Sequence, residues 1–384
     1  MISGALFAAL VAAGVPTIVI TAKGASPGFV FSAAGDFAAF TGFSETLDQL
    51  KATDSRFVLA LGDLSYGGNP RNATSTEVGW CDKFHRSFAD VEIVAGNHDV
   101  GQYPYGEGNI DNFTIQCPFT LPTSLTGRYG REYYFDWPQP GPLARFILIS
   151  PDLIFDNTTY YDYHVNESHY NWTRDAIDDA RVRNIPWVIV GMHKDCIGAG
   201  EHDCETGADI FNLLLEKKVD LIIQAHNHNY ERSKQLAISA ACPGIVEHLY
   251  NGKCEVNDGS SGQYEPRAGS VAVIAGTGGR SIDEFNSSSP YAPYFATWMG
   301  NDSQKPQPTG NPAFGNGVVT YTVDADHITG QTHLNASYAD SFTISSPVAG
   351  SFPQLLYVFT IAGLGVAVAV GVLVWRWRKA RARS

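Results

Sequence analysis

Six short apolar runs, most of them followed at once by polar side chains, restrict the possible folds of this chain more than any other feature. Their length and their content of β-branched and aromatic residues predict buried strands. Segments with a helical spacing of apolar residues lie between several of them, at residues 44–52, 168–182 and 207–218. Strands that alternate with helices predict an α/β fold in which helices cover the sheets. The apolar runs are residues 30–37, 57–64, 91–99, 144–150, 187–193 and 221–228.

The pattern changes after residue 270, where strand-like runs follow one another with only turn residues between them. A meander of this kind predicts a second sheet. Two intervals rich in Pro, Gly, Tyr and Asn, residues 101–143 and 240–268, predict long surface loops.

The C-terminal part of the chain has the composition of a membrane anchor. Residues 355–374 carry no charge and are long enough to cross about 30 Å of hydrocarbon as a helix. A basic tail with two tryptophans follows at residues 375–384, and the positive-inside rule places this tail in the cytoplasm. We therefore expect a single transmembrane helix, preceded by a linker at residues 347–354.

The N-terminal segment is also apolar and ends at a small-x-small site formed by Ala22, Lys23 and Gly24. This pattern predicts that residues 1–24 are a signal peptide or an N-terminal anchor. In both cases a cytoplasmic C-terminus leaves residues 28–350 outside the cell or in a lumen. We therefore expect the chain at the cell membrane, with its large domain extracellular or lumenal.

Two other features of the sequence agree with export. The chain contains eight Asn-x-Ser/Thr sequons, at Asn72, Asn112, Asn157, Asn166, Asn171, Asn286, Asn301 and Asn335. Its six cysteines are an even number without a CxxC motif, which favours disulfides. Their order suggests three local pairs, 81 with 117, 196 with 204 and 242 with 254, although other connectivities remain open.

The charge balance restricts the partners. Lys and Arg number 26 against 39 Asp and Glu, a formal net charge of −13, and several of the basic residues lie in the C-terminal tail. An acidic body of this kind repels polyanions, so nucleic acid is excluded as a partner. A small phosphorylated molecule could still bind at a locally positive site.

Side chains of types that commonly bind metals lie at or just after the ends of five of the six apolar runs. In an α/β sheet the carboxyl ends of parallel strands meet along one crevice, so these side chains should lie together. A mixture of carboxylates, an amide and imidazoles suits two cations such as Fe, Zn or Mn. The side chains in question are Asp36, Asp63, Tyr66, Asn97, His98, Asp99, His193, His226 and His228.

The motifs that contain these residues resemble those of the calcineurin-like metallophosphoesterases. They are GDF at 35–37, GDLSY at 62–66, GNHD at 96–99, VGMH at 190–193 and AHNH at 225–228, followed by NYER. The tyrosine of GDLSY further resembles the purple acid phosphatases of the tartrate-resistant type. The resemblance implies a four-layer αββα sandwich, with two mixed sheets flanked by helices, for a catalytic domain at residues 28–346.

The resemblance also implies a role for each motif residue. Asp36, Tyr66 and His228 would bind the first metal, and Asn97, His193 and His226 would bind the second, with Asp63 bridging both. His98 would face the leaving group, and His202 would contact the substrate. Ala38 and Ala225 depart from the glycines that are usual in the family, but both substitutions are small and leave every ligand in place.

The physical chemistry of phosphate ester hydrolysis supports the same reading. Two cations roughly 3.5 to 4 Å apart clamp the phosphate and lower the pKa of a bridging water, so that metal-bound hydroxide attacks the phosphorus. A phenolate from Tyr66 suits Fe(III), and the second position suits Fe(II), Zn or Mn. His98 is available as a general acid. The GTGGR segment at 276–280 could place Arg280 near phosphate, or could simply be a turn that ends a strand.

We therefore expect a membrane-tethered extracellular phosphomonoesterase of the acid phosphatase type with a small phosphorylated substrate. A phosphodiesterase or nucleotide hydrolase of the same superfamily is the nearest alternative, because the same metals serve both reactions. A catalytically retired cell-surface binding protein is an alternative from another class. Such a protein would be expected to lack some of the metal ligands, whereas all seven ligands implied by the resemblance are present.

Overall fold

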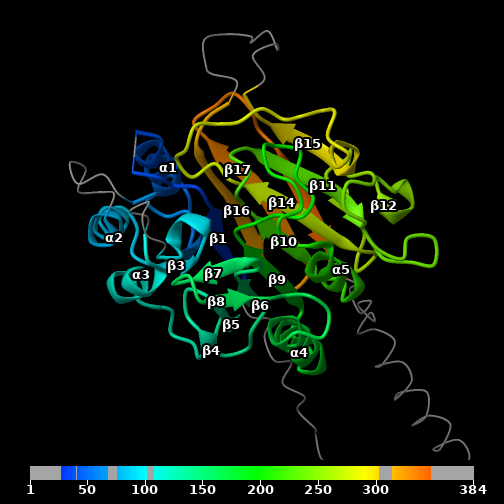
Figure 1. Ribbon diagram of the computed structural model, residues 1–384, viewed down its shortest axis with the longest axis horizontal. Helices are drawn as coiled ribbons and strands as arrows, with labels where there is room; N and C mark the ends of the chain where they lie inside the picture. The colour runs from blue at the N-terminus through cyan, green and yellow to red at the C-terminus, as the bar shows by residue number, and fades with distance from the viewer. Residues whose placement is uncertain (1–26, 40, 68–75, 102–107, 302–313, 347–384) are drawn as a thin grey trace, which may run out of the picture.

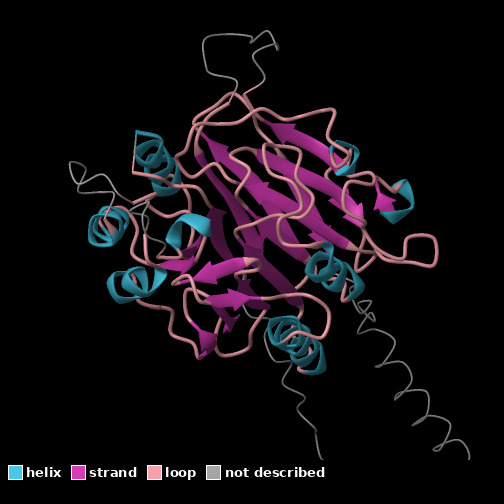
Figure 2. Cartoon of the chain, viewed as in Figure 1, coloured by secondary structure: helices cyan, strands magenta, loops and turns pink. Residues whose placement is uncertain are grey.

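The structure is a computed structural model that describes residues 27–39, 41–67, 76–101, 108–301 and 314–346. Its centre consists of two mixed sheets, and the helices lie around their outside (Figures 1 and 2). The α/β class and the two mixed sheets expected from the sequence are confirmed.

The first sheet has seven strands, of which β1, β2 and β3 run parallel and the β1–β16, β16–β17 and β17–β18 pairs are antiparallel. Three of the six apolar runs thus form adjacent strands of this sheet. In spatial order its strands are β13 (Gln263–Tyr264), β18 (Ser341–Ser345), β17 (His327–Leu334), β16 (Gly317–Val323), β1 (Phe29–Ala34), β2 (Phe57–Leu61) and β3 (Val91–Val94).

The second sheet has nine strands around a parallel centre of β14, β10, β9 and β6. Antiparallel strands extend it on both sides. In order they are β12 (Glu255–Asn257), β11 (Tyr230–Leu236), β14 (Ser270–Ala275), β10 (Leu221–Gln224), β9 (Trp187–Met192), β6 (Ala144–Ile149), β5 (Glu132–Trp137) and β4 (Leu125–Arg128), while β15 (Phe295–Met299) pairs with β11. A separate hairpin joins β7 (Leu153–Phe155) to β8 (Thr159–Tyr161).

The two sheets pack face to face through aromatic side chains. The ring centroids of Phe31 in β1 and Phe146 in β6 are 5.0 Å apart, and those of Phe57 in β2 and Phe135 in β5 are 5.9 Å apart. All four rings are fully buried. Burial of such rings stabilises the fold by roughly 1.5–3 kcal/mol per side chain, so this layer is a main source of stability.

Helices cover the sheets from outside. The helix α1 (Thr41–Lys51) contacts β16 and β17, and α4 (Ser168–Val182) contacts β6. The remaining helices are α2 (Glu77–His85), α3 (Ile110–Gln116) and α5 (Ala208–Glu216), with short 3₁₀ turns η2 (Asn97–Asp99), η3 (Gly252–Cys254) and η4 (Ala292–Tyr294). The three helices expected from apolar spacing correspond to α1, α4 and α5.

Two expectations about the strands need correction. The strands after residue 270 do not form a sheet of their own: β14 lies inside the second sheet, while β16, β17 and β18 extend the first sheet from β1. The interval 101–143 is not only loop, because it contains α3, β4 and the largely buried strand β5. The strands β14 and β16 pair with β10 and β1, which lie far from them in the sequence, whereas β5 pairs with its sequence neighbours β4 and β6.

The three local disulfides suggested by the order of the cysteines are confirmed. Cys81 pairs with Cys117, Cys196 with Cys204 and Cys242 with Cys254. The expected signal segment at 1–24 and the expected span at 355–374 lie outside the described residues. Among the residues that the structure does describe, no helix combines the length and hydrophobicity that a bilayer crossing needs.

Candidate metal centre

The loops that follow β1, β2, β3, β9 and β10 bring the seven expected metal ligands to one region between the two sheets. The strands β1, β2 and β3 are parallel to one another, as are β9 and β10, so within each sheet their carboxyl ends lie at the same edge. A backbone hydrogen bond from the Asp36 amide to the Gly62 carbonyl ties the first two loops together. The convergence expected from the sequence is therefore present in the fold.

One group of donors gathers around the hydroxyl of Tyr66. The Tyr66 oxygen lies 3.0 Å from Oδ1 of Asp36 and 3.0 Å from Nε2 of His228. The second oxygen of Asp36 accepts a hydrogen bond from the backbone amide of His226, which fixes the orientation of this fully buried carboxylate.

A second group gathers around His193. Its Nε2 lies 3.0 Å from Oδ1 of Asn97 and 3.2 Å from Oδ1 of Asp63. The same nitrogen is 4.0 Å from Oδ1 of Asp36, so the two groups adjoin. Asp36, Asp63 and His193 are all buried and offer ligand atoms within 4.8 Å of one another.

The hydrogen-bond chemistry of this region fits bound cations. Nδ1 of His193 lies 2.8 Å from the carbonyl oxygen of Leu61, to which it can only donate, so Nε2 of the neutral ring carries a lone pair. That lone pair faces the oxygens of Asn97 and Asp63, which are acceptors too. Acceptors that converge in a buried place need a positive charge between them, which a metal ion can supply.

The raised pKa values of the His193 and His228 imidazoles have the same cause, an excess of hydrogen-bond acceptors around them. Burial alone would lower the pKa of His193, but Asp63 and Asp36 raise it to about 9. His228 is likewise raised to about 10, against the effect of burial, by Asp283 and Asp36. Without metal, protons on these rings neutralise the carboxylates, and a cation has to displace them.

The acidic groups Tyr66 and Asp63, one from each donor group, respond in opposite ways. Burial raises the pKa of the Tyr66 phenol well above its ordinary value, and the charges of Asp36 and Asp63 raise it further. Burial also opposes ionisation of Asp63, but the charge of His193 outweighs it and lowers the pKa of that carboxyl far below its usual range. A cation bound at the phenol oxygen would oppose this shift and favour the phenolate.

Four of the seven expected ligands have a left-handed backbone conformation. Their φ angles are 62° for Asp36, 51° for Asp63, 53° for Tyr66 and 72° for His226. Non-glycine residues adopt this region at an energetic cost, and such residues cluster at functional sites. The strained backbone at these four residues therefore serves to direct their side chains toward the site.

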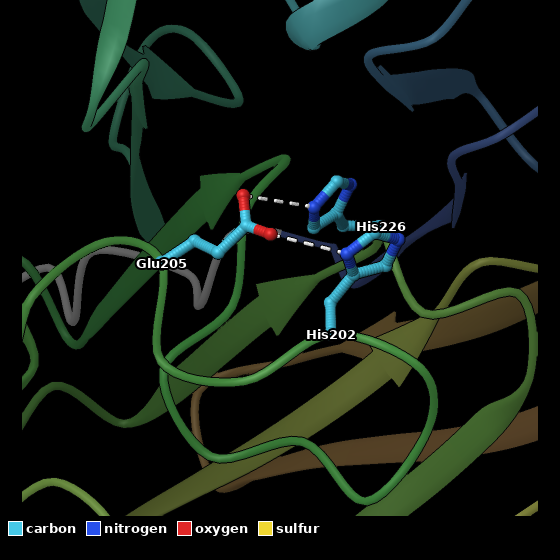
Figure 3. A group of neighbouring side chains, drawn as sticks. All are labelled: His202, Glu205 and His226. Carbon is cyan, nitrogen blue, oxygen red and sulfur yellow. Dashed lines mark hydrogen bonds and ion pairs between the residues drawn. The ribbon is translucent and has the colours of Figure 1, made fainter.

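His226 and His202 lie side by side with one carboxylate, that of Glu205 (Figure 3). Their ring centroids are 3.7 Å apart, and Glu205 lies 3.1 Å from Nδ1 of His202 and 3.2 Å from Nε2 of His226. The ring of His226 is also 4.9 Å from that of His193. His202, expected to contact the substrate, therefore lies beside the candidate centre.

Asn227, the residue between the two histidines of the AHNH motif, holds the loop that carries His202. Its side-chain oxygen accepts a hydrogen bond from the backbone amide of His202 at 2.8 Å, and its amide donates to the His202 carbonyl at 3.1 Å and to Asp195 at 3.0 Å. Glu231 binds the same loop through the backbone amide of Ala199. The Cys196–Cys204 disulfide closes this loop.

His98 lies at the rim of the centre. Its backbone amide donates to Asp63, its Nε2 is 3.8 Å from Oδ2 of Asp63, and its side chain is one-third exposed. The neighbouring Asp99 is buried and accepts hydrogen bonds from the amides of Gly96 and Leu64, which makes it a support for the loop.

Glu205 and Asp283 are site residues that the sequence did not reveal. Oδ2 of Asp283 lies 3.2 Å from Nδ1 of His228, on the side of the ring opposite the nitrogen that faces Tyr66. Neither acid belongs to a strand-end motif. The single signal for Glu205 is its position directly after Cys204, and Asp283 carries none.

The chain matches the family model of the calcineurin-like phosphoesterases over residues 33–230, a range that contains all seven expected ligands. Among curated proteins it is 25% identical to purple acid phosphatase 21 of Arabidopsis thaliana over 56% of this chain and 47% of that protein. It is 24% identical to the Fe(3+)-Zn(2+) purple acid phosphatase 12 of the same plant, over 66% of this chain and 51% of that protein. The chain thus spans about half the length of these relatives.

Solved structures agree on the fold. The purple acid phosphatase PPD1 from yellow lupin (Lupinus luteus) seeds superposes with a TM-score of 0.57 at 19% identity, covering 84% of this chain and 55% of that one. GAP50, the anchor in the inner membrane complex of Plasmodium, superposes with a TM-score of 0.50 at 14% identity, covering 83% and 89%. With a family model that matches half of its length and motifs that converge in space, this chain belongs to the calcineurin-like metallophosphoesterases and is distantly similar to the purple acid phosphatases.

Proposed function

We propose that the chain is a membrane-tethered, extracellular binuclear metallophosphatase that hydrolyses phosphate monoesters. The observation that carries the proposal is the meeting of two donor groups, one around Tyr66 and one around His193. Asp36 of the first group lies 4.0 Å from His193, and Asp63 lies 3.2 Å from the same ring. Similarity to relatives named as purple acid phosphatases supports the acid phosphatase type.

In this proposal Asp36, Tyr66 and His228 bind one cation and Asn97, His193 and His226 bind the other, with Asp63 between them. A phenol with so high a pKa in the metal-free protein becomes a ligand only for a strongly Lewis-acidic ion, which favours Fe(III) at the Tyr66 position. The second position would take Fe(II), Zn or Mn. The two bound cations would neutralise charge on the phosphate and acidify a water molecule.

Two histidines act on the substrate rather than on the metals. His98, at the partly exposed rim, donates a proton to the oxygen of the departing alcohol. His202 binds a phosphate oxygen from the disulfide-closed loop. The positions of these rings, next to Asp63 and His226 respectively, support both roles.

Glu205 and Asp283 serve as positioning residues. Each lies at ion-pair distance from an imidazole of the AHNH motif, Glu205 3.2 Å from His226 and Asp283 3.2 Å from His228. A carboxylate of this kind fixes the tautomer and the ring orientation, so that the other ring nitrogen is directed to the metal.

The proposal for location combines the disulfides with the two terminal segments. Three disulfides persist in oxidising compartments, which agrees with a domain outside the cytoplasm. Residues 355–374 would form the anchor. Intact cells that express the chain should then hydrolyse an impermeant phosphomonoester, and activity that appears only after lysis would contradict an outward-facing domain at the cell surface.

The catalytic proposal is tested by metal analysis and turnover of the purified protein. We expect about two metals per chain, at least one of them iron, and hydrolysis of p-nitrophenyl phosphate in preference to bis(p-nitrophenyl) phosphate. Preference for the diester would instead support a phosphodiesterase. Full metal occupancy without hydrolysis of either compound would support a retired binding protein.

A further inference from the structure

Lys194 directly follows the proposed ligand His193, and its ammonium group lies between oxygen atoms from two separate segments of the chain. Nζ lies 2.7 Å from Oδ2 of Asp152, 3.2 Å from the Asp152 carbonyl oxygen and 3.0 Å from Oε2 of Glu205. An ammonium group has three N–H donors, and each of them has an acceptor here. The lysine side chain is only 11% exposed, so these contacts are largely shielded from water.

Asp152 connects this lysine to the β7–β8 hairpin. It lies directly before β7, its backbone amide donates to the Tyr161 carbonyl at 3.2 Å, and its Oδ1 accepts a hydrogen bond from the Tyr160 hydroxyl at 3.2 Å. Its φ angle of 57° lies in the left-handed region, which a non-glycine residue adopts at an energetic cost. The two oxygens of its carboxylate therefore have different partners: Oδ1 contacts the hairpin, and Oδ2 contacts Lys194.

Glu205 connects the same lysine to the metal centre. Its Oε1 lies 3.1 Å from Nδ1 of His202 and its Oε2 lies 3.2 Å from Nε2 of His226, so one carboxylate contacts both rings (Figure 3). Oε2 is also the oxygen that Lys194 contacts. The Glu205 side chain is 37% exposed and has several rotatable bonds, so without this partner it would be free to turn toward water. Lys194 thus holds the carboxylate where it meets the two histidines.

From these contacts we propose that Lys194 is a positioning residue of the metal centre. It holds Glu205 against His226 and His202, and it makes the β7–β8 hairpin part of the support of the site. The inference rests on the proposed binuclear function and adds a residue that acts through Glu205, not on the substrate, because protein oxygens already occupy its three donors. Loss of the lysine should loosen the second metal position through His226 and weaken substrate binding through His202.

The test removes the ammonium group and measures metal binding and substrate binding separately. Lys194→Met keeps most of the length of the side chain and should lower affinity for the second metal about fivefold or more, measured by competition with a chelator on the purified full chain. With the metal sites saturated, KM for p-nitrophenyl phosphate should rise about threefold or more, while kcat changes less. Lys194→Arg should restore most of both values, because a guanidinium can contact both carboxylates.

A double-mutant cycle decides whether Lys194 acts through Glu205. If it does, Lys194→Met combined with Glu205→Ala should lose no more metal affinity than Glu205→Ala alone, because the lysine then has no carboxylate to position. Losses that add would overturn the proposal, since they would show that Lys194 contacts the substrate or supports His193 directly. Should Lys194→Met fail to fold in thermal melts, Lys194→Gln takes its place in the same cycle.

Asp152→Ala tests the part of the hairpin. It should change metal affinity and KM in the same direction as Lys194→Met but by less, because Lys194 keeps its contact with Glu205. Unchanged values in Asp152→Ala would overturn the role of the hairpin.

Lys217→Met is the matched control. Lys217 follows the last residue of α5, is also partly buried, and pairs with the carboxylate of Asp178 at 2.8 Å. Its replacement should change neither metal affinity nor KM. Equal effects of the Lys194→Met and Lys217→Met changes, or no effect of Lys194→Met, would overturn the positioning role.

The outcomes also separate this inference from the proposed function. If the wild-type protein binds two metals and hydrolyses no ester, the phosphatase proposal fails, and the cycle in metal affinity still decides the role of Lys194. If p-nitrophenyl phosphate is hydrolysed and the losses in the cycle add, the phosphatase stands and the positioning role fails. A wild-type protein that binds no second metal would overturn both.

Discussion

Oε2 of Glu205 lies 3.2 Å from Nε2 of His226. This contact joins a proposed metal ligand to a residue that lies outside all the strand-end motifs. Lys194 lies 3.0 Å from the same carboxylate oxygen, and the contacts with His202, His226 and Lys194 lower the pKa of Glu205 well below its ordinary value. These contacts favour the ionised carboxylate, which can hold both rings.

Replacing this carboxylate should weaken the second metal position. In Glu205→Gln the ring of His226 loses its charged acceptor, so we expect affinity for the second metal to fall by about tenfold or more. Metal titration followed by elemental analysis measures this. Glu201→Gln, an exposed change in the same loop, is the matched control. Unchanged metal affinity together with a raised KM would show that Glu205 acts only through His202.

Tyr66 should give the protein its colour. If the phenolate binds Fe(III), the iron-loaded protein has a visible charge-transfer band, and Tyr66→Phe removes that band. Tyr160→Phe changes an exposed tyrosine and should leave the band intact. An active, colourless, iron-free wild-type protein would instead indicate an ordinary divalent metallophosphoesterase.

Asp63 should be needed for metal binding, whereas His98 should be needed only for turnover. Asp63→Asn removes the buried anion next to His193, so both metal occupancy and activity should collapse. His98→Ala should leave the metals bound and slow turnover by about 100-fold or more, because the leaving group loses its proton donor. Elemental analysis and steady-state kinetics on both variants provide the comparison. Equal metal loss in the two would make His98 a ligand or a structural residue.

The disulfide-closed loop should matter for the substrate more than for stability. The bond closes a short loop, and its entropic contribution is below the roughly 3 kcal/mol of a 15-residue loop. Asn227 and Glu231 hold the same segment without it. Replacing Cys196 and Cys204 together by serine should therefore keep metal content and most of the thermal stability.

The expected change in the double variant is kinetic. His202 is no longer fixed beside His226, so KM should rise or kcat should fall. Thermal melts, metal analysis and kinetics are compared with those of a variant that lacks the remote Cys242–Cys254 bond. Loss of metal in the Cys196 and Cys204 variant would show that the loop supports His193, and the substrate role of His202 would lose its basis.

The sequence by itself determined the strands that carry the site and the residue types at their ends. Asp36, Asp63 and His193 follow buried apolar runs, and the short length and β-branched content of these runs favour strands over helices. Because parallel strands end at a common edge, the order of motifs was enough to predict that these side chains meet. The local order of the cysteines likewise indicated the pairing that the structure has.

Only the tertiary structure decided which segments outside the strand-end motifs lie next to the metal centre. Asp283 reaches His228 because β14 lies beside β10 and β11, and Arg280 reaches Tyr66 across the two sheets. The same holds for β16, which pairs with β1 rather than forming a sheet after residue 270. Pairings of this kind depend on packing between segments far apart in the chain, and no local periodicity encodes them.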